Sequence, residues 1–336
     1  MNFNGISQIG IVGGGSAALM LALEAAKKGI QTTLLDPEIN CIGAEVASEH
    51  IIATITNESI QKLSLRSDAI IFNTNLGYEL DAKLHAPTYP SMQVMNKLSD
   101  QKELLHLLEK LQIPIPKTYF LDNQPDTFKR IEELSFPFKF VKQYKNSAES
   151  MDILNEEDAA DFILEVAEAE SFIIQSITAY DSIIACLCIV DKEGKIALYD
   201  PLEEKFEEEA LCAIQVANHL SKTMLQKITR YNRKVLKELG EQGAFTIKYG
   251  LKPNKGIELI EITPEISLSG ILTTEAYDMP IYEQYMHMIL DMKVVQPSLM
   301  HNVHGTIKQS HIMRPVNVPY HIYNIGVTRL CLTSND

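Results

Sequence analysis

The sequence has few cysteines and few basic residues for its length, and it has no long apolar run. Its five cysteines are an odd number and lie scattered, without the spacing of a metal site. We therefore expect reduced thiols, and neither a disulfide framework nor a cysteine-bound metal. The histidines near the carboxyl end also lack a metal-binding motif, and we expect solvated or core side chains. They are His301, His304, His311 and His321.

Basic side chains are outnumbered, since the chain has 30 lysines and arginines against 44 aspartates and glutamates, a formal charge of −14. This charge repels phosphate backbones and anionic lipids, so nucleic acid and membrane surfaces are excluded as expected partners. No apolar stretch approaches the roughly 18 residues of a membrane helix. No basic segment precedes the first apolar stretch, and we expect a cytoplasmic protein without a leader or a membrane anchor.

What the chain does have is the composition of a globular protein, with 46% hydrophobic and 22% charged residues. Its 336 residues allow two or three domains around sizeable cores. Strands and helices alternate over the first part of the chain, which favours a doubly wound parallel sheet. The strands expected there are residues 9–12, 31–35, 51–53 and 69–72.

A glycine-rich turn joins the first of these strands to a helix. The run from Gly13 to Ala18 fits G-x-G-x-x-A, in which small residues let backbone amides at a helix start approach a phosphate. Asp36, at the end of the second strand, is placed to hold a ribose. The pattern alone leaves two interpretations open: the dinucleotide site of a flavin or nicotinamide oxidoreductase, or the tight turn of any doubly wound domain.

Periodicity predicts the elements of the rest of the chain. Ser99 is expected to cap a helix that runs to Leu111, before the Ile113–Pro116 segment stops it. Further on we expect helices at residues 126–134, 156–168, 217–239 and 275–290, and strands at residues 138–142, 172–177, 183–190, 195–199, 244–249 and 257–262.

Taken together with Asp36-Pro37, residues 9–20 resemble the opening of the carboxyaminoimidazole ribonucleotide synthetases, I-G-I-[IV]-G-G-G-Q-L-x-x-M followed by an L-D-P strand end. The resemblance continues through nearly the whole chain, at Gln112–Pro116, Phe136-Pro137, Tyr199–Glu203, Ile262–Pro264 and Glu283-Gln284. It implies an α/β ATP-grasp fold in three parts. These are a doubly wound pre-ATP-grasp domain at residues 1–96, an ATP-grasp domain at residues 97–272 with a lid at about 115–180, and a small carboxyl-terminal domain at residues 273–336.

Members of that family bind ATP between two sheet-bearing lobes, phosphorylate bicarbonate and pass the carboxyl group to the amine of aminoimidazole ribonucleotide. The resemblance therefore implies ATP and magnesium as cofactors, a small nucleotide or carboxylate as ligand, and a homodimer. The residues expected to meet the nucleotide are Lys102, Lys142, Gln175 and Ser176, with magnesium on Glu261. The substrate-binding residues expected at the glycine turn are Gly13, Gly15, Ser16 and Asp36.

Several positions depart from the family pattern. The lid pattern T-R-x-G-G-Y-D-G-K-G lets backbone amides fold over phosphates, but Gln143–Ser150 has no glycine. Lys248 stands where a magnesium-binding glutamate belongs, and we expect it to pair with Glu261 and hold two strands together. Glu265 replaces an arginine of the ribotide site, and near the end Tyr323–Val327 replaces R-K-M-G-H.

The acidic run Glu203–Glu209 is interpreted as a solvated face, although its first residue aligns with a family active-site glutamate. Three functions remain open. The first is an ATP-grasp protein whose ancestral reaction is weak or absent and which has a binding or regulatory role. The second is an active ATP-dependent carboxylate–amine ligase of altered specificity. The third is a flavin or nicotinamide oxidoreductase that uses the glycine turn.

Overall fold

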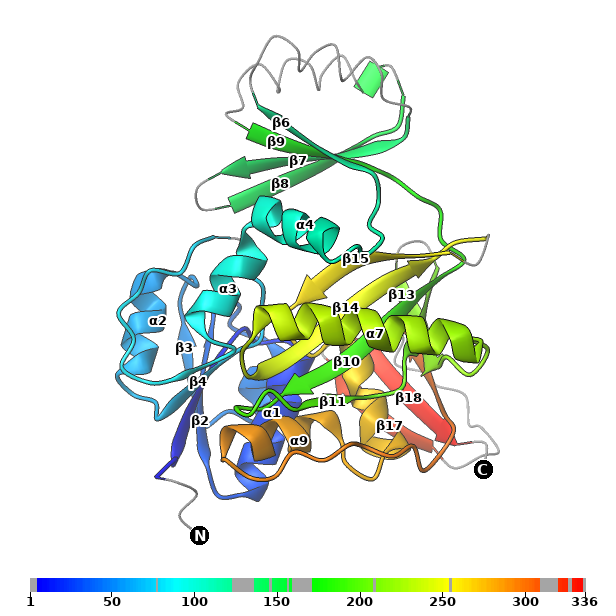
Figure 1. Cartoon of the computed structure of the whole chain (residues 1–336). Helices are drawn as coiled ribbons and strands as arrows, with labels where there is room; N and C mark the ends of the chain where they lie inside the picture. Colours follow the sequence, from blue (N-terminus) through cyan, green and yellow to red (C-terminus); the bar gives the residue numbers. More distant parts are fainter. Residues whose placement is uncertain are drawn as a thin grey trace.

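Three sheets with flanking helices make up the chain (Figure 1). The computed structural model describes residues 5–76, 78–122, 136–144, 147–155, 157–158, 171–207, 210–253, 256–308, 320–325 and 328–334. The mixed α/β class predicted from the sequence is confirmed. Among the described helices, none combines the length and the hydropathy that a membrane span requires.

The amino-terminal sheet is parallel throughout, in the order β3-β2-β1-β4-β5. Its strands are β1 (Gln8–Val12), β2 (Gln31–Asp36), β3 (Glu49–Ile52), β4 (Ala69–Phe72) and β5 (Thr88–Tyr89). Helix α1 (Ser16–Lys27) shares a core with Ile9 and Ile11 on one face of the sheet. Helix α2 (Asn57–Ser64) shares another with Phe72 on the other face. The predicted doubly wound arrangement is therefore confirmed.

The helix predicted from Ser99 to Leu111 is present as α4 (Gln101–Lys110), and a further helix that was not predicted, α3 (Met92–Ser99), precedes it. The cap assignment was wrong by one residue, because the carboxylate of Asp100 accepts the hydrogen bond from the amide of Glu103. The Ser99 hydroxyl instead donates to the carbonyl of Met95, in the last turn of α3. Two capping side chains stand next to each other here, and the charged one is the stronger acceptor.

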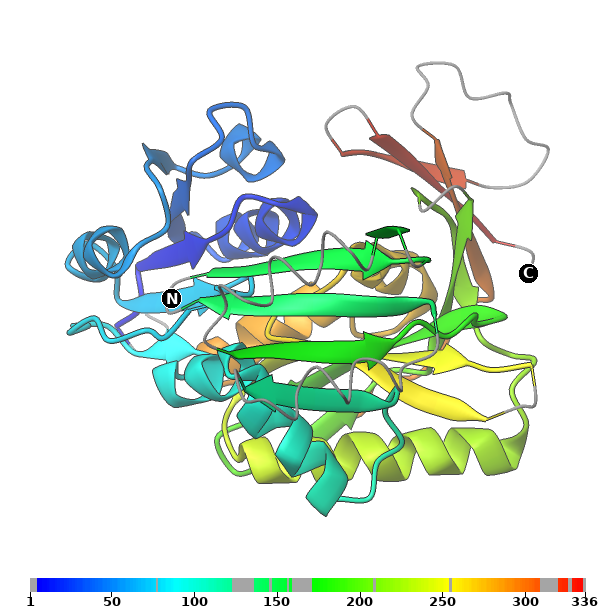
Figure 2. The same ribbon diagram turned by 90° about the horizontal axis from the view of Figure 1, so that it is seen from above.

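A lid sheet stands at one end of the molecule, with its four strands in the order β6-β9-β7-β8 (Figures 1 and 2). They are β6 (Thr118–Asp122), β7 (Phe138–Tyr144), β8 (Ser147–Ile153) and β9 (Ser171–Ser176), all antiparallel. The strands predicted at residues 138–142 and 172–177 are confirmed. The helix predicted at 126–134 lies outside the described residues, as does most of the one predicted at 156–168.

The large sheet joins the middle of the chain to its end, in the order β15-β14-β10-β12-β13-β16-β18-β17, with β11 paired to β10. The strands are β10 (Ser182–Val190), β11 (Ile196–Leu198), β12 (Leu202–Glu207), β13 (Ala210–Val216), β14 (Gly243–Leu251), β15 (Ile257–Thr263), β16 (Val303–Lys308), β17 (Tyr320–Ile325) and β18 (Thr328–Ser334). The carboxyl-terminal strands β16, β18 and β17 extend this sheet beyond β13.

Helix α7 (Lys222–Leu239) lies along one face of the large sheet (Figure 1). It begins five residues later than the predicted Ala217, because the Ser221 hydroxyl accepts the hydrogen bond from the amide of Met224 and caps it there. It ends as predicted at Gly240, whose φ of 77° lies in the left-handed region.

The helix predicted at residues 275–290 is present as α9 (Ile281–Ile289), which begins six residues later than predicted. Two short helices that were not predicted, η2 (Leu268–Leu272) and α8 (Thr273–Ala276), precede it. Pro280 precedes α9, and the Thr273 hydroxyl accepts the hydrogen bond from the amide of Ile281. A proline is favourable at a helix start and unfavourable inside a helix, so the break falls at this position.

Candidate ligand cleft

Polar side chains cross the large sheet on the face opposite α7. Phe245, Ile247 and Tyr249 of β14 belong to the same core as α7. Because side chains alternate along a strand, Lys248 points to the other face. The register places it directly opposite Glu261 of β15 on one side and Ala185 of β10 on the other.

Lys248 forms two ion pairs on this face. Its Nζ lies 3.2 Å from Glu261 Oε2 and 3.5 Å from Glu204 Oε2. Glu204 belongs to β12, beyond β10, where it lies opposite Ile183, two residues from Ala185 on the same face, so the lysine reaches it diagonally across β10. The predicted pairing of Lys248 with Glu261 is confirmed, whereas the pairing with Glu204 was missed.

Glu204 is the most deeply buried member of this group, with 2% of its surface exposed. Its Oε1 accepts a short hydrogen bond from the Ser269 hydroxyl. The interpretation of the acidic run as a solvated face was wrong at its start. Glu203 is also buried, and it accepts a hydrogen bond of 2.6 Å from Gln215 Nε2. Both glutamates lie on β12 where β10 and β13 flank it, and exposure begins at Lys205.

The charges of this face act on one another. Burial alone lowers the pKa of Lys248, but Glu204 and Glu261 outweigh burial and raise that pKa above its ordinary value. Glu265 follows β15, and its pKa is raised, first by burial and then by repulsion from Glu261, with Lys248 opposing both. The lysine is therefore held in its charged form, whereas Glu265 takes up a proton more readily than a free glutamate.

A cavity of about 800 Å³ adjoins the group. It lies between the segment that leaves the lid sheet and the ends of β12 and β13. Glu204 lines it, which connects the cavity to the ion pairs of Lys248. The other lining residues are Thr178, Tyr180, Asp181, Ser182, Ile183, Lys205, Phe206, Glu207 and Cys212.

Two family models match the chain. The model of the ATP-grasp domain matches residues 106–281, more than half of the chain, and that of the ribonucleotide synthetase preATP-grasp domain matches residues 6–76. The chain belongs to the ATP-grasp family. These models give no support to an oxidoreductase that uses the glycine turn.

The ATP-grasp chain is similar over most of its length to N5-carboxyaminoimidazole ribonucleotide synthases. The synthase of Staphylococcus epidermidis is 23% identical, and the match covers 96% of this chain and 90% of the synthase. The synthase of Aquifex aeolicus is also 23% identical, and the match covers 88% of this chain and 81% of the synthase. The solved structure from Thermus thermophilus has a TM-score of 0.81 at 16% identity, covering 98% and 94%. The Aspergillus clavatus synthase in complex with ADP and 5-aminoimidazole ribonucleotide has a TM-score of 0.74 at 18% identity, covering 90% and 82%. The predicted ATP-grasp fold and relationship are confirmed.

The residues predicted to meet the nucleotide lie on three elements, β9, α4 and β7, outside the Lys248 group, which consists of Lys248, Glu204 and Glu261. Gln175 and Ser176 end β9, where Gln175 Nε2 donates to the Thr118 hydroxyl at 3.2 Å and the Ser176 amide donates to the carbonyl of Lys117 at 2.9 Å. Lys102 is exposed on α4. Lys142 is on β7, paired with Phe172, and its side chain lies outside the described part. Their nucleotide contacts stay predictions.

The residues predicted to bind substrate meet at the β1–α1 turn. Gly13 has a φ of +95°, and a Cβ added to it would lie 2.8 Å from the carbonyl oxygen of Asn73, so both backbone conformation and space require glycine. Gly15 and Ser16 begin α1, and Asp36 reaches the same turn from β2. Their substrate contacts also stay predictions.

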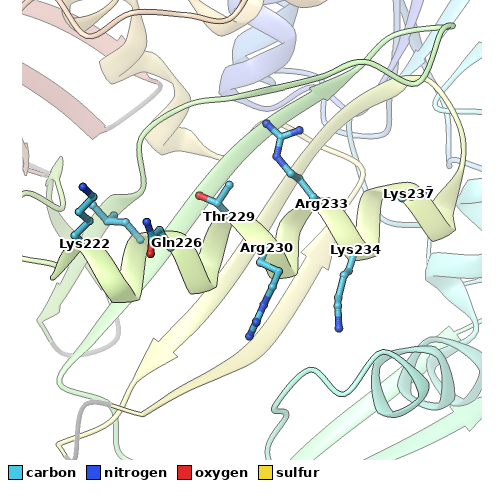
Figure 3. Close-up of a pocket in the computed structure, with 8 residues that line it drawn as sticks. Lys222, Gln226, Thr229, Arg230, Arg233, Lys234 and Lys237 are labelled. Carbon is cyan, nitrogen blue, oxygen red and sulfur yellow. The ribbon is translucent and has the colours of Figure 1, made fainter.

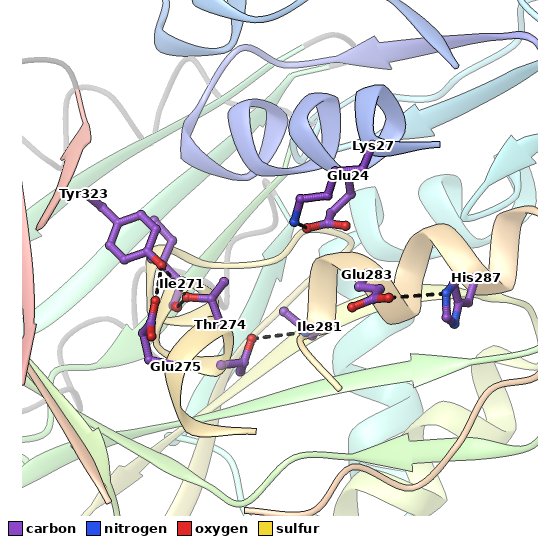
Figure 4. A network of polar contacts seen from close by, with 10 residues as sticks. Glu24, Lys27, Ile271, Thr274, Glu275, Ile281, Glu283, His287 and Tyr323 are labelled. Atoms are coloured by element: carbon purple, nitrogen blue, oxygen red, sulfur yellow. Dashed lines mark hydrogen bonds and ion pairs between the residues drawn. The ribbon is translucent and has the colours of Figure 1, made fainter. Parts of the chain in front are cut away.

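The end of the chain contributes a carboxylate network where the family pattern has basic residues. The Tyr323 hydroxyl donates to Glu275 Oε1 at 2.6 Å and lies 2.9 Å from the Thr274 hydroxyl (Figure 4). Burial and then the hydrogen bond to Glu275 raise the pKa of Tyr323 to about 12. His321 Nδ1 lies 3.2 Å from the same Glu275 oxygen. A tyrosine and a glutamate therefore occupy this place, and Gly326 and Val327 lie outside the described residues.

The histidines of the described residues do not gather into a metal site. Of the four near the carboxyl end, His304 Nδ1 lies 3.2 Å from Gln215 Oε1, and His311 lies outside the described residues. Across the part of the chain that the structure describes, no three histidine, cysteine, aspartate or glutamate side chains are grouped so that they could hold a metal ion.

A second hollow, of about 560 Å³, lies along the exposed side of α7 (Figure 3). Its lining is rich in cations, in contrast to the overall charge of the chain. The lining residues are Lys222, Leu225, Gln226, Thr229, Arg230, Arg233, Lys234 and Lys237. Because α7 covers the face of the sheet opposite Lys248, this hollow is separate from the cavity that Glu204 lines.

Proposed function

We propose that this ATP-grasp protein binds a small nucleotide or carboxylate ligand in the cavity lined by Glu204, the ion-pair partner of Lys248, and does not carboxylate aminoimidazole ribonucleotide at an enzymatic rate. Its role is then one of binding or regulation. The observation that carries the proposal is Glu265, a partly buried carboxylate whose pKa is raised by burial and then by the charge of Glu261. The resemblance places an arginine for the ribotide phosphate there, and two neighbouring carboxylates repel a phosphate instead.

Two further observations support the proposal. In the lid, Gln143 and Tyr144 pair with Ala148 and Ser147 across the β7–β8 hairpin, so that strand pairing occupies this stretch where the family has a glycine loop. At the carboxyl end, Glu275 accepts from Tyr323 at the place of a basic phosphate clamp. Three stretches that the resemblance assigns to phosphate recognition thus depart from the family pattern, which supports the proposal.

The test is phosphate release from ATP in the presence of magnesium, bicarbonate and aminoimidazole ribonucleotide. The Staphylococcus epidermidis synthase, assayed in parallel, serves as the positive control. We expect this chain to show no increase in phosphate release when the ribotide is added. A ribotide-dependent turnover of about 1 s⁻¹ or faster, in the usual range of enzymes, overturns the proposal.

An active ligase of altered specificity is the second candidate, favoured by the retained Glu261 and the cavity beside Glu204. Thermal unfolding with and without ADP shows whether the chain binds a nucleotide at all. Both the binding protein and the ligase of altered specificity are distinguished in this way from a chain that binds none. A ligand at 100 times its dissociation constant stabilises the folded state by about 2.7 kcal/mol, which raises the melting temperature. Phosphate release that depends on another carboxylate or amine, rather than on the ribotide, identifies the ligase.

A further inference from the structure

The Lys248 group does not fit a magnesium ion. Magnesium requires oxygen ligands close to the ion, and a carboxylate pair is the usual protein contribution. Here an ammonium lies between the two carboxylates, 3.2 Å from Glu261 Oε2 and 3.5 Å from Glu204 Oε2. A second cation in the same place would be repelled by Lys248 and would find both carboxylates already paired.

The ammonium is built into the fold. Glu204 has an exposed fraction of 2%, and a buried carboxylate is costly unless it is paired and hydrogen-bonded. Lys248 supplies the opposite charge and Ser269 supplies a hydrogen bond to the other oxygen. On β10, Ala185 lies opposite Lys248, and Ile183, two residues away on the same face, lies opposite Glu204, so the lysine reaches Glu204 diagonally across this strand.

We propose that Lys248 is a built-in cation that takes the place of a divalent metal ion between Glu204 and Glu261. The wild-type protein therefore holds no divalent cation at this pair. Two carboxylates and one ammonium sum to −2 + 1 = −1, whereas the K248E variant has three carboxylates and a charge of −3 at the same place. A single substitution converts the group into a divalent-cation site.

This inference is independent of the proposed function, because ribotide carboxylation can be absent with or without a metal ion. Its test is a titration of the full chain with Mn²⁺. Binding is measured by electron paramagnetic resonance, as the loss of the signal of the free ion. We expect the wild type to retain no Mn²⁺ through Glu261, so that its titration matches that of E261Q. The K248E variant gains one site, at least about tenfold tighter than any wild-type binding, because hard cations prefer clustered carboxylates.

The matched control is K248E/E261Q, which restores the wild-type number of carboxylates in the group and should lose the added site. One Mn²⁺ bound by the wild type and lost in E261Q overturns the proposal. A folded K248E chain without a new site overturns it as well, because the two glutamates would then not be arranged around a cation position.

If K248E does not fold, a second variant tests the same proposal. K248Q removes the ammonium and adds no charge, so Glu204 and Glu261 are left as a pair of carboxylates. We expect it to bind Mn²⁺ more tightly than the wild type and to melt at a higher temperature when Mn²⁺ is added, while the wild type and E261Q do not respond. Equal Mn²⁺ responses of K248Q and the wild type overturn the proposal.

Discussion

The backbone amide of Gly14 donates a hydrogen bond of 2.7 Å to Oδ2 of Asp36. The other carboxylate oxygen, Oδ1, accepts from the amide of Glu38 at 2.8 Å. One side chain at the end of β2 therefore holds both the β1–α1 turn and the start of the next loop. Asp36 was predicted to bind a substrate. In the structure its carboxylate also links two segments of the backbone, because it accepts hydrogen bonds from both.

Replacing Asp36 with alanine should destabilise the protein. D36A removes the acceptor of two amides, and hydrogen bonds to a charged group are stronger than neutral ones. We expect a loss of about 1–3 kcal/mol in the free energy of unfolding, measured by urea denaturation. The control is D81A, which removes an exposed aspartate of the same domain. Equal stability of the two variants would mean that the Asp36 contacts contribute nothing net.

The same turn predicts different outcomes for two neighbouring glycines. A Cβ added at Gly14 would lie 2.5 Å from Sγ of Cys41, a buried side chain, whereas one added at Gly15 meets nothing within 4 Å. We expect G14A to lose about 1–3 kcal/mol by overpacking. G15A should stay within about 1 kcal/mol of the wild type. Thermal unfolding of both variants checks the difference, and an equally tolerated G14A contradicts it.

The sequence predicts elements well where local signals agree. The apolar run at residues 9–12 and the glycine after it predict a buried strand and a turn, and both are present. Prediction was wrong where two signals compete, as at Ser99 and Asp100, either of which can cap α4. It was also wrong about the start of α7, because Ser221 caps that helix and the first helical residue, Lys222, comes five residues after the predicted Ala217.

The candidate site was harder to predict, because its members meet through the order of the strands. The pairing of Lys248 with Glu261 was predictable, since β14 and β15 form a hairpin and the two residues are directly opposite. Glu204 joins them only because β12 lies beyond β10 in the sheet, in a register that places Glu204 opposite Ile183, two residues from the Ala185 that faces Lys248. A run of glutamates looks solvated in the sequence, and only the position of β12 between two strands buries its first residues.

Two fully buried tyrosines give a matched pair of tests. The Tyr249 hydroxyl donates to Asn232 Oδ1 at 2.7 Å, whereas the Tyr282 hydroxyl has no hydrogen-bond partner among the described residues. Y249F leaves a buried amide oxygen without that donor, and we expect a loss of about 1–3 kcal/mol. Y282F removes a buried hydroxyl that has no compensating bond, and we expect unchanged or higher stability. The opposite order of stability in urea denaturation contradicts the hydrogen bonding described.

His287 should make the stability of the protein depend on pH. It lies on α9, where burial and then the charge of Lys28 lower its pKa below the ordinary value of 6.5, although Nε2 is 3.6 Å from Glu283 (Figure 4). Between that ordinary value and the lower folded pKa, the unfolded chain binds more protons than the folded chain. The contribution of His287 to stability therefore falls as the pH drops through this window and is constant above it.

The measurement is the free energy of unfolding of the wild type and H287Q between pH 7 and pH 5. We expect the wild type to lose more stability over this range, because H287Q removes the group that takes up a proton on unfolding. H85Q, which removes an exposed histidine, serves as the control and should follow the wild type. A steeper loss in H287Q than in the wild type would mean that the charged imidazole is stabilised by Glu283, since protonation would then favour the folded state.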